Sequence, residues 1–289
     1  MSSLYIVLAC LFWAFDSLIR YPLIQNGISA AQVVSFEHFF ALFLFSLFFK
    51  KSYTKLFQRK YVVEFLFIGC FGSALATLAF SKAFQFMNPS VVIILQKLQP
   101  LVAITFAHLI LKEKVVKGFL SWALVCLVGV VLISWKDFIV FSNEYSLQNM
   151  MGYFYTAVAV MGWGLATVFG RKLTLKGLNE REIIFGRFSF SLIVLVPLFL
   201  FQGSQWQYDL NLTKEILILV LISAILGMSF YYKGLKVTPA KQATILELFF
   251  PLFAVIINWV AFNQTLSLIQ FIGAGALILG STMIQLKKY

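Results

Sequence analysis

Charged residues are scarce in this chain of 289 residues: they make up 12% of it, and 11 of them are acidic. A soluble domain carries about 25% charged residues, so a soluble protein of this composition would lack the charge that keeps a surface hydrated. Hydrophobic residues instead make up 61% of the chain, and its mean hydropathy is +0.91. These figures exclude a water-soluble globular protein and indicate an integral membrane protein.

Signatures of metal and catalytic sites are also missing from the sequence. The cysteines, Cys10, Cys70 and Cys126, lie within apolar runs and lack metal-ligand spacing, which argues against a disulfide scaffold and a zinc site. No glycine-rich phosphate loop, HExxH helix or nucleophile elbow occurs, and the longest polar stretch, near 136–149, is about a dozen residues long. We therefore expect no enzymatic activity, no cofactor and no metal.

The formal net charge of +12 would suggest a nucleic-acid partner in a soluble protein. The 33 phenylalanines and the long apolar runs contradict that interpretation. We expect no nucleic-acid partner and interpret the basic residues as signals of membrane topology.

Ten apolar runs of helical length follow one another with short polar loops between them. They lie near residues 4–20, 32–49, 62–82, 90–111, 117–135, 150–171, 183–201, 215–233, 240–262 and 267–286. A membrane-spanning helix needs about 20 residues, and the runs are too uniformly apolar for the strands of a membrane barrel. The sequence predicts an all-α integral membrane protein with ten transmembrane helices.

The loop charges provide an independent check on this count. When Lys97 and Arg187 are set aside as intramembrane residues, alternation of ten helices assigns 17 lysines and arginines to one side and 4 to the other. A missed helix would destroy this separation, so it supports ten spans and cytoplasmic termini. Because the chain has no organelle transit signal, we expect a bacterial inner membrane.

The second half of the chain repeats the first. Shifts of 150 or 151 residues align Trp13 with Trp163, Gly27 with Gly177, Lys82 with Lys233, Pro100 with Pro251, and Gly129 with Gly280. We therefore expect two five-helix units, 1–140 and 141–289, that together form one membrane domain. Because five is odd, the second unit enters the membrane from the opposite face, which gives the inverted repeat of alternating-access transporters.

Features of a known family accompany this repeat. A proline lies within the fourth and ninth spans, the acidic turn Leu111–Lys114 follows the fourth, and glycines recur in the fifth and tenth. The chain thus resembles the EamA branch of the drug/metabolite transporter superfamily over essentially its whole length. The resemblance implies a central cavity lined by helices 1–4 and 6–9. The chain departs from the family pattern in two places. Asn263 and Gln264 replace the second acidic turn, and the arginine common in the second span occurs only in the seventh span, as Arg187, whose counterpart in the second span is Glu37. We therefore expect the two gates to be unequal.

Two ionisable residues are predicted near the centre of the membrane. Lys97 and Glu247 each lie about eight residues into a span, where a charge costs roughly 2.5–3.5 kcal/mol on insertion scales. The repeat aligns Glu247 with Gln96, next to Lys97, which predicts the two charges on opposite walls of one cavity. We expect Lys97 to bind a substrate carboxylate and Glu247 to bind an amine or a coupling proton. The alternative is a structural ion pair between the two spans.

Other residues are expected to bind substrate around these charges. Trp13 and Trp163 lie mid-span at matched positions, away from the interface where tryptophan usually anchors helices, and we expect them to line the cavity; helix packing is the alternative. Gln96, Gln99 and Thr244 are expected to form hydrogen bonds with the substrate.

A further group is assigned to gates and hinges. We expect gating or proton coupling at Asp16, Glu37, His108 and Arg187, and hinges at Pro100 and Pro251. Asp16 lies one turn before Arg20, which also permits a local salt bridge. His108 follows Lys97 by three helical turns, so both are expected on one face; a histidine at the lipid headgroups is the alternative.

The sequence as a whole predicts a secondary transporter that moves a small polar or amino-acid-like metabolite by alternating access, with or without proton coupling. An exporter of lipophilic or quaternary cations is the second hypothesis, which Lys97 opposes. A non-transport subunit or lipid-handling protein is the third, and it predicts a lipid-facing Lys97 and Glu247. Expected partners are a small-molecule substrate and membrane lipid, in a monomer or homodimer.

Overall fold

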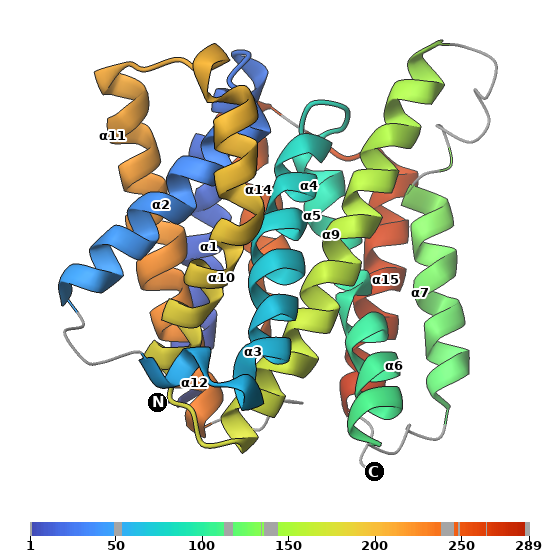
Figure 1. Ribbon diagram of the computed structural model, residues 1–289. Helices are drawn as coiled ribbons and strands as arrows, with labels where there is room; N and C mark the ends of the chain where they lie inside the picture. The colour runs from blue at the N-terminus through green and yellow to red at the C-terminus, as the bar shows by residue number, and fades with distance from the viewer. Residues whose placement is uncertain are drawn as a thin grey trace.

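The computed structural model describes residues 2–48, 54–112, 118–133, 135, 144–237, 246–247, 249–263 and 265–286, and every element in these ranges is a helix (Figure 1). The first half contains α1 (Ser2–Gln25), α2 (Ala30–Phe48), η1 (Thr54–Phe57), α3 (Arg59–Leu66), η2 (Phe67–Leu75), α4 (Ala76–Ala83), α5 (Pro89–Leu95), η3 (Gln96–Leu98), α6 (Gln99–Leu111) and α7 (Phe119–Ile133). The second half contains α9 (Glu144–Leu175), α10 (Glu180–Gln202), η4 (Gly203–Gln205), α11 (Leu210–Leu219), η5 (Val220–Gly227), α12 (Met228–Val237), α14 (Phe249–Phe262) and α15 (Leu268–Leu286).

Seven helical segments in the described ranges are long and apolar enough to cross a membrane. Three shorter apolar helices, Phe119–Ile133, Phe249–Phe262 and Leu268–Gly280, fall in the remaining predicted runs. The prediction of an all-helical protein with several membrane spans is confirmed. The count of ten stays a prediction, because the short helices fall below the roughly 20 residues that a full crossing needs.

Matched irregularities mark the two repeats in the backbone. The π-helical segments η2 and η5 interrupt the third and eighth predicted spans at equivalent positions. Gly27 and Gly177 follow the ends of α1 and α9 with φ of +87° and +84°, a conformation that glycine adopts without strain. Lys112 and Asn263 follow α6 and α14 with φ of +56° and +53°. Equivalent breaks at equivalent places support two copies of one unit.

The two repeats pack against each other through equivalent helices. α9 contacts η2, α4 and α6 of the first half, and its counterpart α1 contacts η5, α12 and α14 of the second half. In Figure 1, α1 begins at the lower end of the bundle and α9 begins at the upper end. Counterpart helices therefore run in opposite directions, and each repeat supplies half of a shared interior.

One end of the bundle carries a cluster of basic residues, and we call it the basic end. It holds the start of α1 and the turn between α9 and α10, at the bottom of Figure 1. Lys172 Nζ and Lys176 Nζ lie 2.9 and 2.8 Å from Glu64 Oε1 and thereby join α9 to α3. Asn179 begins α10 with a capping box, in which its side chain accepts from the Glu182 N–H and Glu182 Oε2 accepts from the Asn179 N–H.

Helices α7 and α15 pack against each other at the periphery (Figure 1). Glycines form the contact. A Cβ on Gly129 would lie 2.6 Å from the Gly273 carbonyl oxygen, and a Cβ on Gly273 would lie 2.7 Å from the Gly129 carbonyl oxygen. The glycines that recur in the fifth and tenth predicted spans thus allow the two helix backbones to approach closely within one chain.

We expect Gly273→Ala to lower the free energy of unfolding by about 1–3 kcal/mol, because its methyl group would meet the α7 backbone, which cannot move aside. A Cβ on Gly275 would have no atom within 4 Å, so Gly275→Ala is the matched control and should be neutral or slightly stabilising. Unfolding in detergent measures both variants. Equal losses of stability would show that this glycine contact does not hold α7 against α15.

Candidate functional site

A cavity of about 820 Å³ lies between the two halves of the bundle. Residues from the first four and the sixth to ninth predicted spans line it, whereas the described residues of α7 and α15 do not contribute. This lining agrees with the expectation drawn from the family resemblance. The volume lies within the range of about 300–1,000 Å³ that is typical of sites for drug-sized molecules.

The cavity reaches the surface at the basic end. Thr174 and Asn179, which flank the turn between α9 and α10, are exposed and line it. Toward the other end its lining residues Asp16, Arg20 and Glu37 are buried, with exposed fractions of 7%, 2% and 5%. The structure is therefore open toward the basic end and closed toward the opposite end.

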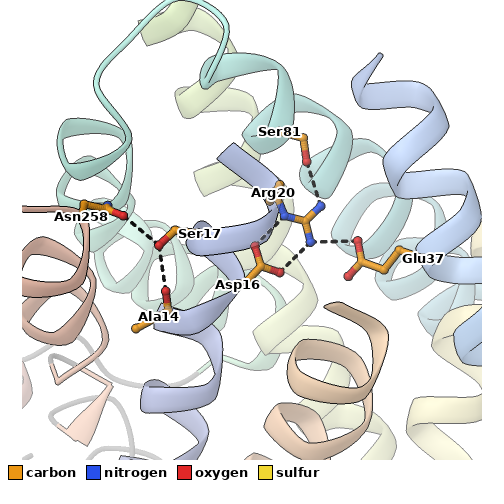
Figure 2. Close-up of polar contacts among 7 residues, drawn as sticks. All are labelled: Ala14, Asp16, Ser17, Arg20, Glu37, Ser81 and Asn258. Atoms are coloured by element: carbon orange, nitrogen blue, oxygen red, sulfur yellow. Dashed lines mark hydrogen bonds and ion pairs between the residues drawn. The ribbon is translucent and has the colours of Figure 1, made fainter. Parts of the chain in front are cut away.

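A buried network around Arg20 lies at the opposite end of the cavity, and Figure 2 shows its polar contacts. Arg20 donates from Nε to Asp16 Oδ1 at 2.6 Å and from Nη2 to Asp16 Oδ2 at 2.7 Å. The same guanidinium donates to Glu37 Oε2 at 2.9 Å and to Ser81 Oγ at 3.0 Å. The predicted local salt bridge is confirmed, and it extends to α2 and α4. One guanidinium thus joins three predicted spans through charge-assisted hydrogen bonds.

A second polar group lies on the cavity wall beside this network. Arg187 donates from Nη2 to the Gly72 carbonyl oxygen at 2.7 Å and from Nε to Ser73 Oγ at 3.2 Å. Ser73 Oγ lies 2.9 Å from His38 Nε2, and His38 Nδ1 lies 2.8 Å from the Val34 carbonyl oxygen. A carbonyl oxygen can only accept, so Nδ1 carries a proton, and Nε2 shares a hydrogen bond with the Ser73 hydroxyl. The sequence predicts a site role for Arg187 but not for His38 or Ser73.

We expect Ser73→Ala to lower the free energy of unfolding by about 1–3 kcal/mol, because buried His38 Nε2 and Arg187 Nε would both lose a partner. Ser223→Ala, at another serine of the same cavity, is the matched control. Chemical denaturation in detergent measures the difference. A Ser73 variant as stable as the Ser223 variant would contradict this account of the wall.

Both mid-span tryptophans line the cavity, and each forms a pair with another ring. The ring centroids of Trp13 and Tyr231 lie 5.1 Å apart, and those of Trp163 and Phe80 also lie 5.1 Å apart. Phe80 and Tyr231 line the cavity too, and a shift of 151 residues aligns them. Neither is among the residues predicted from the sequence, although the shift that aligns the prolines would have found them.

Lys97 and Glu247 are neighbours, so the prediction that they occupy opposite walls is wrong. Lys97 Nζ donates to the main-chain oxygen of Glu247 at 2.8 Å, and Glu247 Oε1 accepts from the Tyr231 hydroxyl at 2.7 Å. The residues meet because α5 packs against α14, which brings the fourth and ninth spans together. Across the described ranges, the ion pairs do not include one between the Lys97 ammonium and the Glu247 carboxylate. Both residues line the cavity, unlike the lipid-facing placement that the third hypothesis predicts.

The other residues predicted around the charges are distributed as follows. Gln96 and Gln99 line the cavity, and Gln99 Nε2 donates to Thr167 Oγ1 at 3.3 Å. The Gln96 side-chain oxygen is buried and accepts no hydrogen bond from the part of the chain that the structure describes. Thr244 lies outside the described residues.

The prolines predicted as hinges lie at the beginnings of helices. The fourth span is broken by the 3-10 turn η3, and Pro100 follows it in the first turn of α6, where a missing N–H leaves no helical bond unmade. Pro251 lies in the first turn of α14. A hinge role for either proline stays a prediction.

The structure places His108 outside the cavity that Lys97 lines, and a gating or proton-coupling role for it stays a prediction. Lys97 is buried at the cavity, whereas His108 is exposed on α6 and is absent from the cavity lining. Lys97 lies within the 3-10 turn η3, and the two steps that follow it advance by about 120° instead of 100°, which adds about 40° to the angle between Lys97 and His108.

Comparisons with known proteins agree with this architecture. The EamA-like transporter family matches the chain twice, over residues 1–135 and 150–286. The chain is similar to the riboflavin transporter ImpX of Fusobacterium nucleatum subsp. nucleatum, at 29% identity over 99% of this chain and 97% of that protein. It is also similar to an uncharacterized transporter of Acidianus ambivalens, at 26% identity over 75% of this chain and 81% of that protein. A solved crystal structure shares the fold, with a TM-score of 0.63 and 16% identity over 99% of this chain and 96% of that one.

Proposed function

Because the chain belongs to the EamA-like transporter family, and so is a membrane transporter and not an enzyme, we propose that it carries a neutral metabolite with a planar ring by alternating access. The cavity between the repeats carries this proposal, since it is open at one end and closed by a buried ionic network at the other. The sequence contains no phosphate-binding loop, so we propose secondary transport without ATP hydrolysis by this chain.

The size and lining of the cavity support a planar, uncharged substrate. A volume of about 820 Å³ far exceeds what one amino acid requires, and two aromatic pairs offer surfaces on which a ring can stack. Away from the exposed mouth, the acidic and basic lining residues balance: they are Asp16, Glu37 and Glu247 against Arg20, Lys97 and Arg187. Riboflavin is the first candidate, since a similar protein is named a riboflavin transporter.

An amino-acid-like metabolite is the second candidate. The ammonium of Lys97 and the carboxylate of Glu247 lie at neighbouring positions and suit the carboxylate and amine of a zwitterion. A lipophilic cation would find the aromatic rings and Glu247 favourable but would be repelled by Lys97.

We propose that the Arg20 network is the gate at the opposite end and that its counterpart at the basic end is weaker. The repeat aligns Asp16, Arg20, Glu37 and Ser81 with Ala166, Gly170, Arg187 and Tyr232, all of which line the cavity. The counterpart positions carry one charge and two small residues, so they cannot form an equivalent ionic contact. This inequality supports a resting state open toward the basic end, which the distribution of loop charges predicts to be cytoplasmic.

Cysteine labelling tests this resting state. In a variant whose native cysteines are replaced, Gly170→Cys and Thr77→Cys place thiols in the cavity. We expect a membrane-impermeant maleimide to label both at least ten times faster from the basic side than from the opposite side. Equal rates from the two sides, or faster labelling from the opposite side, would contradict an unequal pair of gates.

A thermal-unfolding screen tests the substrate class. Purified protein in detergent is heated with riboflavin, amino acids or lipophilic cations, in parallel with Lys97→Ala and Glu247→Gln. Riboflavin at 100 times its Kd should stabilise the wild type by about 2.7 kcal/mol, and the variants should lose most of this effect. Stabilisation by amino acids alone or by lipophilic cations alone would overturn the planar-ring proposal.

A further inference from the structure

We infer that the cavity distinguishes the two edges of a planar fused ring. The hydrogen-bonding edge of the bound ring faces Tyr231, Glu247 and Lys97, and the apolar edge of the ring faces Phe80 and Trp163. This inference rests on the proposed transport function and adds the residues that set its specificity.

The two aromatic pairs form a symmetric frame within the cavity. Trp13 pairs with Tyr231, and the counterparts Trp163 and Phe80 pair at the same centroid distance of 5.1 Å, with similar interplanar angles of 52° and 57°. All four rings line one cavity. Aromatic side chains stack on planar heterocycles whatever polar groups those heterocycles carry, so this frame recognises ring shape.

The chemistry on this frame is asymmetric, because the repeats differ at the residues beside the rings. Tyr231 carries a hydroxyl, which donates to Glu247 Oε1 at 2.7 Å, whereas its counterpart Phe80 has no polar atom. Lys97 Nζ joins the Tyr231 side through its 2.8 Å bond to the Glu247 main chain. One aromatic pair therefore carries a hydroxyl group beside Glu247 and Lys97, and the other carries no hydroxyl group.

The polar groups retain capacity for hydrogen bonds to a ligand. An ammonium has three donors, and the Lys97 ammonium uses one of them on the Glu247 carbonyl oxygen. Glu247 Oε1 accepts from Tyr231, which leaves Oε2 as an acceptor, and the buried Gln96 side-chain oxygen has no donor among the described residues. Donors and acceptors side by side match the edge of an imide, which presents an N–H between two carbonyl groups.

Riboflavin has both of the edges that this arrangement requires. Its fused ring carries an imide at one end and two methyl groups at the other, and its hydroxyl-rich chain is uncharged. We therefore assign the imide to the side of Tyr231, Glu247 and Lys97, and the methyl-bearing edge to the side of Phe80 and Trp163.

Quenching of riboflavin fluorescence by the purified protein in detergent measures binding without requiring transport. The probes are riboflavin, riboflavin methylated on its imide nitrogen, and riboflavin lacking its two ring methyl groups. The variants are Tyr231→Phe and Phe80→Tyr, with Tyr5→Phe as a control outside the cavity. Each changes one hydroxyl group and preserves the ring.

We expect imide methylation to weaken binding to the wild type about tenfold, and Tyr231→Phe to remove most of that discrimination. Phe80→Tyr should weaken riboflavin binding severalfold while having less effect on the probe without ring methyl groups. Tyr5→Phe should behave as the wild type. If Tyr231→Phe does not fold, Glu247→Gln tests the same edge, since it keeps an acceptor for Tyr231 and removes the charge.

The outcomes separate this inference from the proposed function. Riboflavin binding with unchanged discrimination in both Tyr231→Phe and Phe80→Tyr would overturn the assignment of edges and leave the proposed transport intact. No binding of riboflavin by the wild type would overturn the assignment of edges and remove riboflavin as the candidate substrate, and the thermal-unfolding screen then decides the proposed substrate class.

Discussion

Replacement of Arg20 by methionine should lower the free energy of unfolding by about 3–5 kcal/mol, the largest loss that we expect from a single substitution in this chain. The guanidinium is 2% exposed and makes all of its described hydrogen bonds to Asp16, Glu37 and Ser81. Without it, two buried carboxylates would face each other with no cation between them. Unfolding in detergent, induced by a titration with denaturant, measures the loss of stability.

Two controls separate this effect from a general sensitivity to lost positive charge. Lys214→Met removes an exposed cation near the same end and should change stability by less than about 0.5 kcal/mol. Asp16→Asn combined with Arg20→Met should recover part of the loss, because it removes one of the unpaired charges. An Arg20→Met variant as stable as Lys214→Met would show that the network does not hold the opposite end closed.

Glu247→Gln should reduce riboflavin transport about ten- to hundredfold, which corresponds to roughly 1.5–3 kcal/mol for a hydrogen bond to a charged group. The amide keeps the size of the side chain and an acceptor for the Tyr231 hydroxyl, so the variant isolates the negative charge. Removal of that charge also leaves the Lys97 ammonium without an acidic side chain beside it. Initial uptake rates in proteoliposomes measure the change.

Glu215→Gln, at an exposed acid of α11, is the matched control and should transport as the wild type does. The kind of transport that is lost from Glu247→Gln assigns the role of the carboxylate. Loss of both exchange and gradient-driven uptake would assign Glu247 to substrate binding, and loss of gradient-driven uptake alone would assign it to the coupling proton. Undiminished rates in both assays would remove Glu247 from the mechanism.

Much of the fold could be predicted because membrane helices and repeats leave strong patterns in a sequence. Apolar runs mark the helices, since every backbone polar group in the membrane must be satisfied within the chain. The aligned Gly27 and Gly177 follow the ends of equivalent helices, and both residues have a positive φ. The family that matches both halves of the chain agrees with the predicted resemblance.

The arrangement of the site was less predictable, because it depends on how helices rotate and which of them cross. A 3-10 turn before Gln99 changes the rotation of α6 relative to Lys97, and His108 lies exposed outside the cavity lining. Packing of α5 against α14 brings Lys97 to Glu247, which alignment of the repeats alone could not show. Tyr231 carried a usable signal, since the repeat aligns it with Phe80, but aromatic residues are too common in this chain for that signal to stand out.

Counterflow of labelled riboflavin tests the central claim most directly. Proteoliposomes loaded with unlabelled riboflavin are diluted into a trace of labelled riboflavin, with the wild type, with Trp13→Ala combined with Trp163→Ala, and with no protein. We predict transient accumulation of label by the wild type, and at least a tenfold lower initial rate for the variant that lacks both tryptophans of the cavity. Accumulation by the variant at the wild-type rate, or none by a wild type that is folded and binds riboflavin, would contradict transport of a planar metabolite through this cavity.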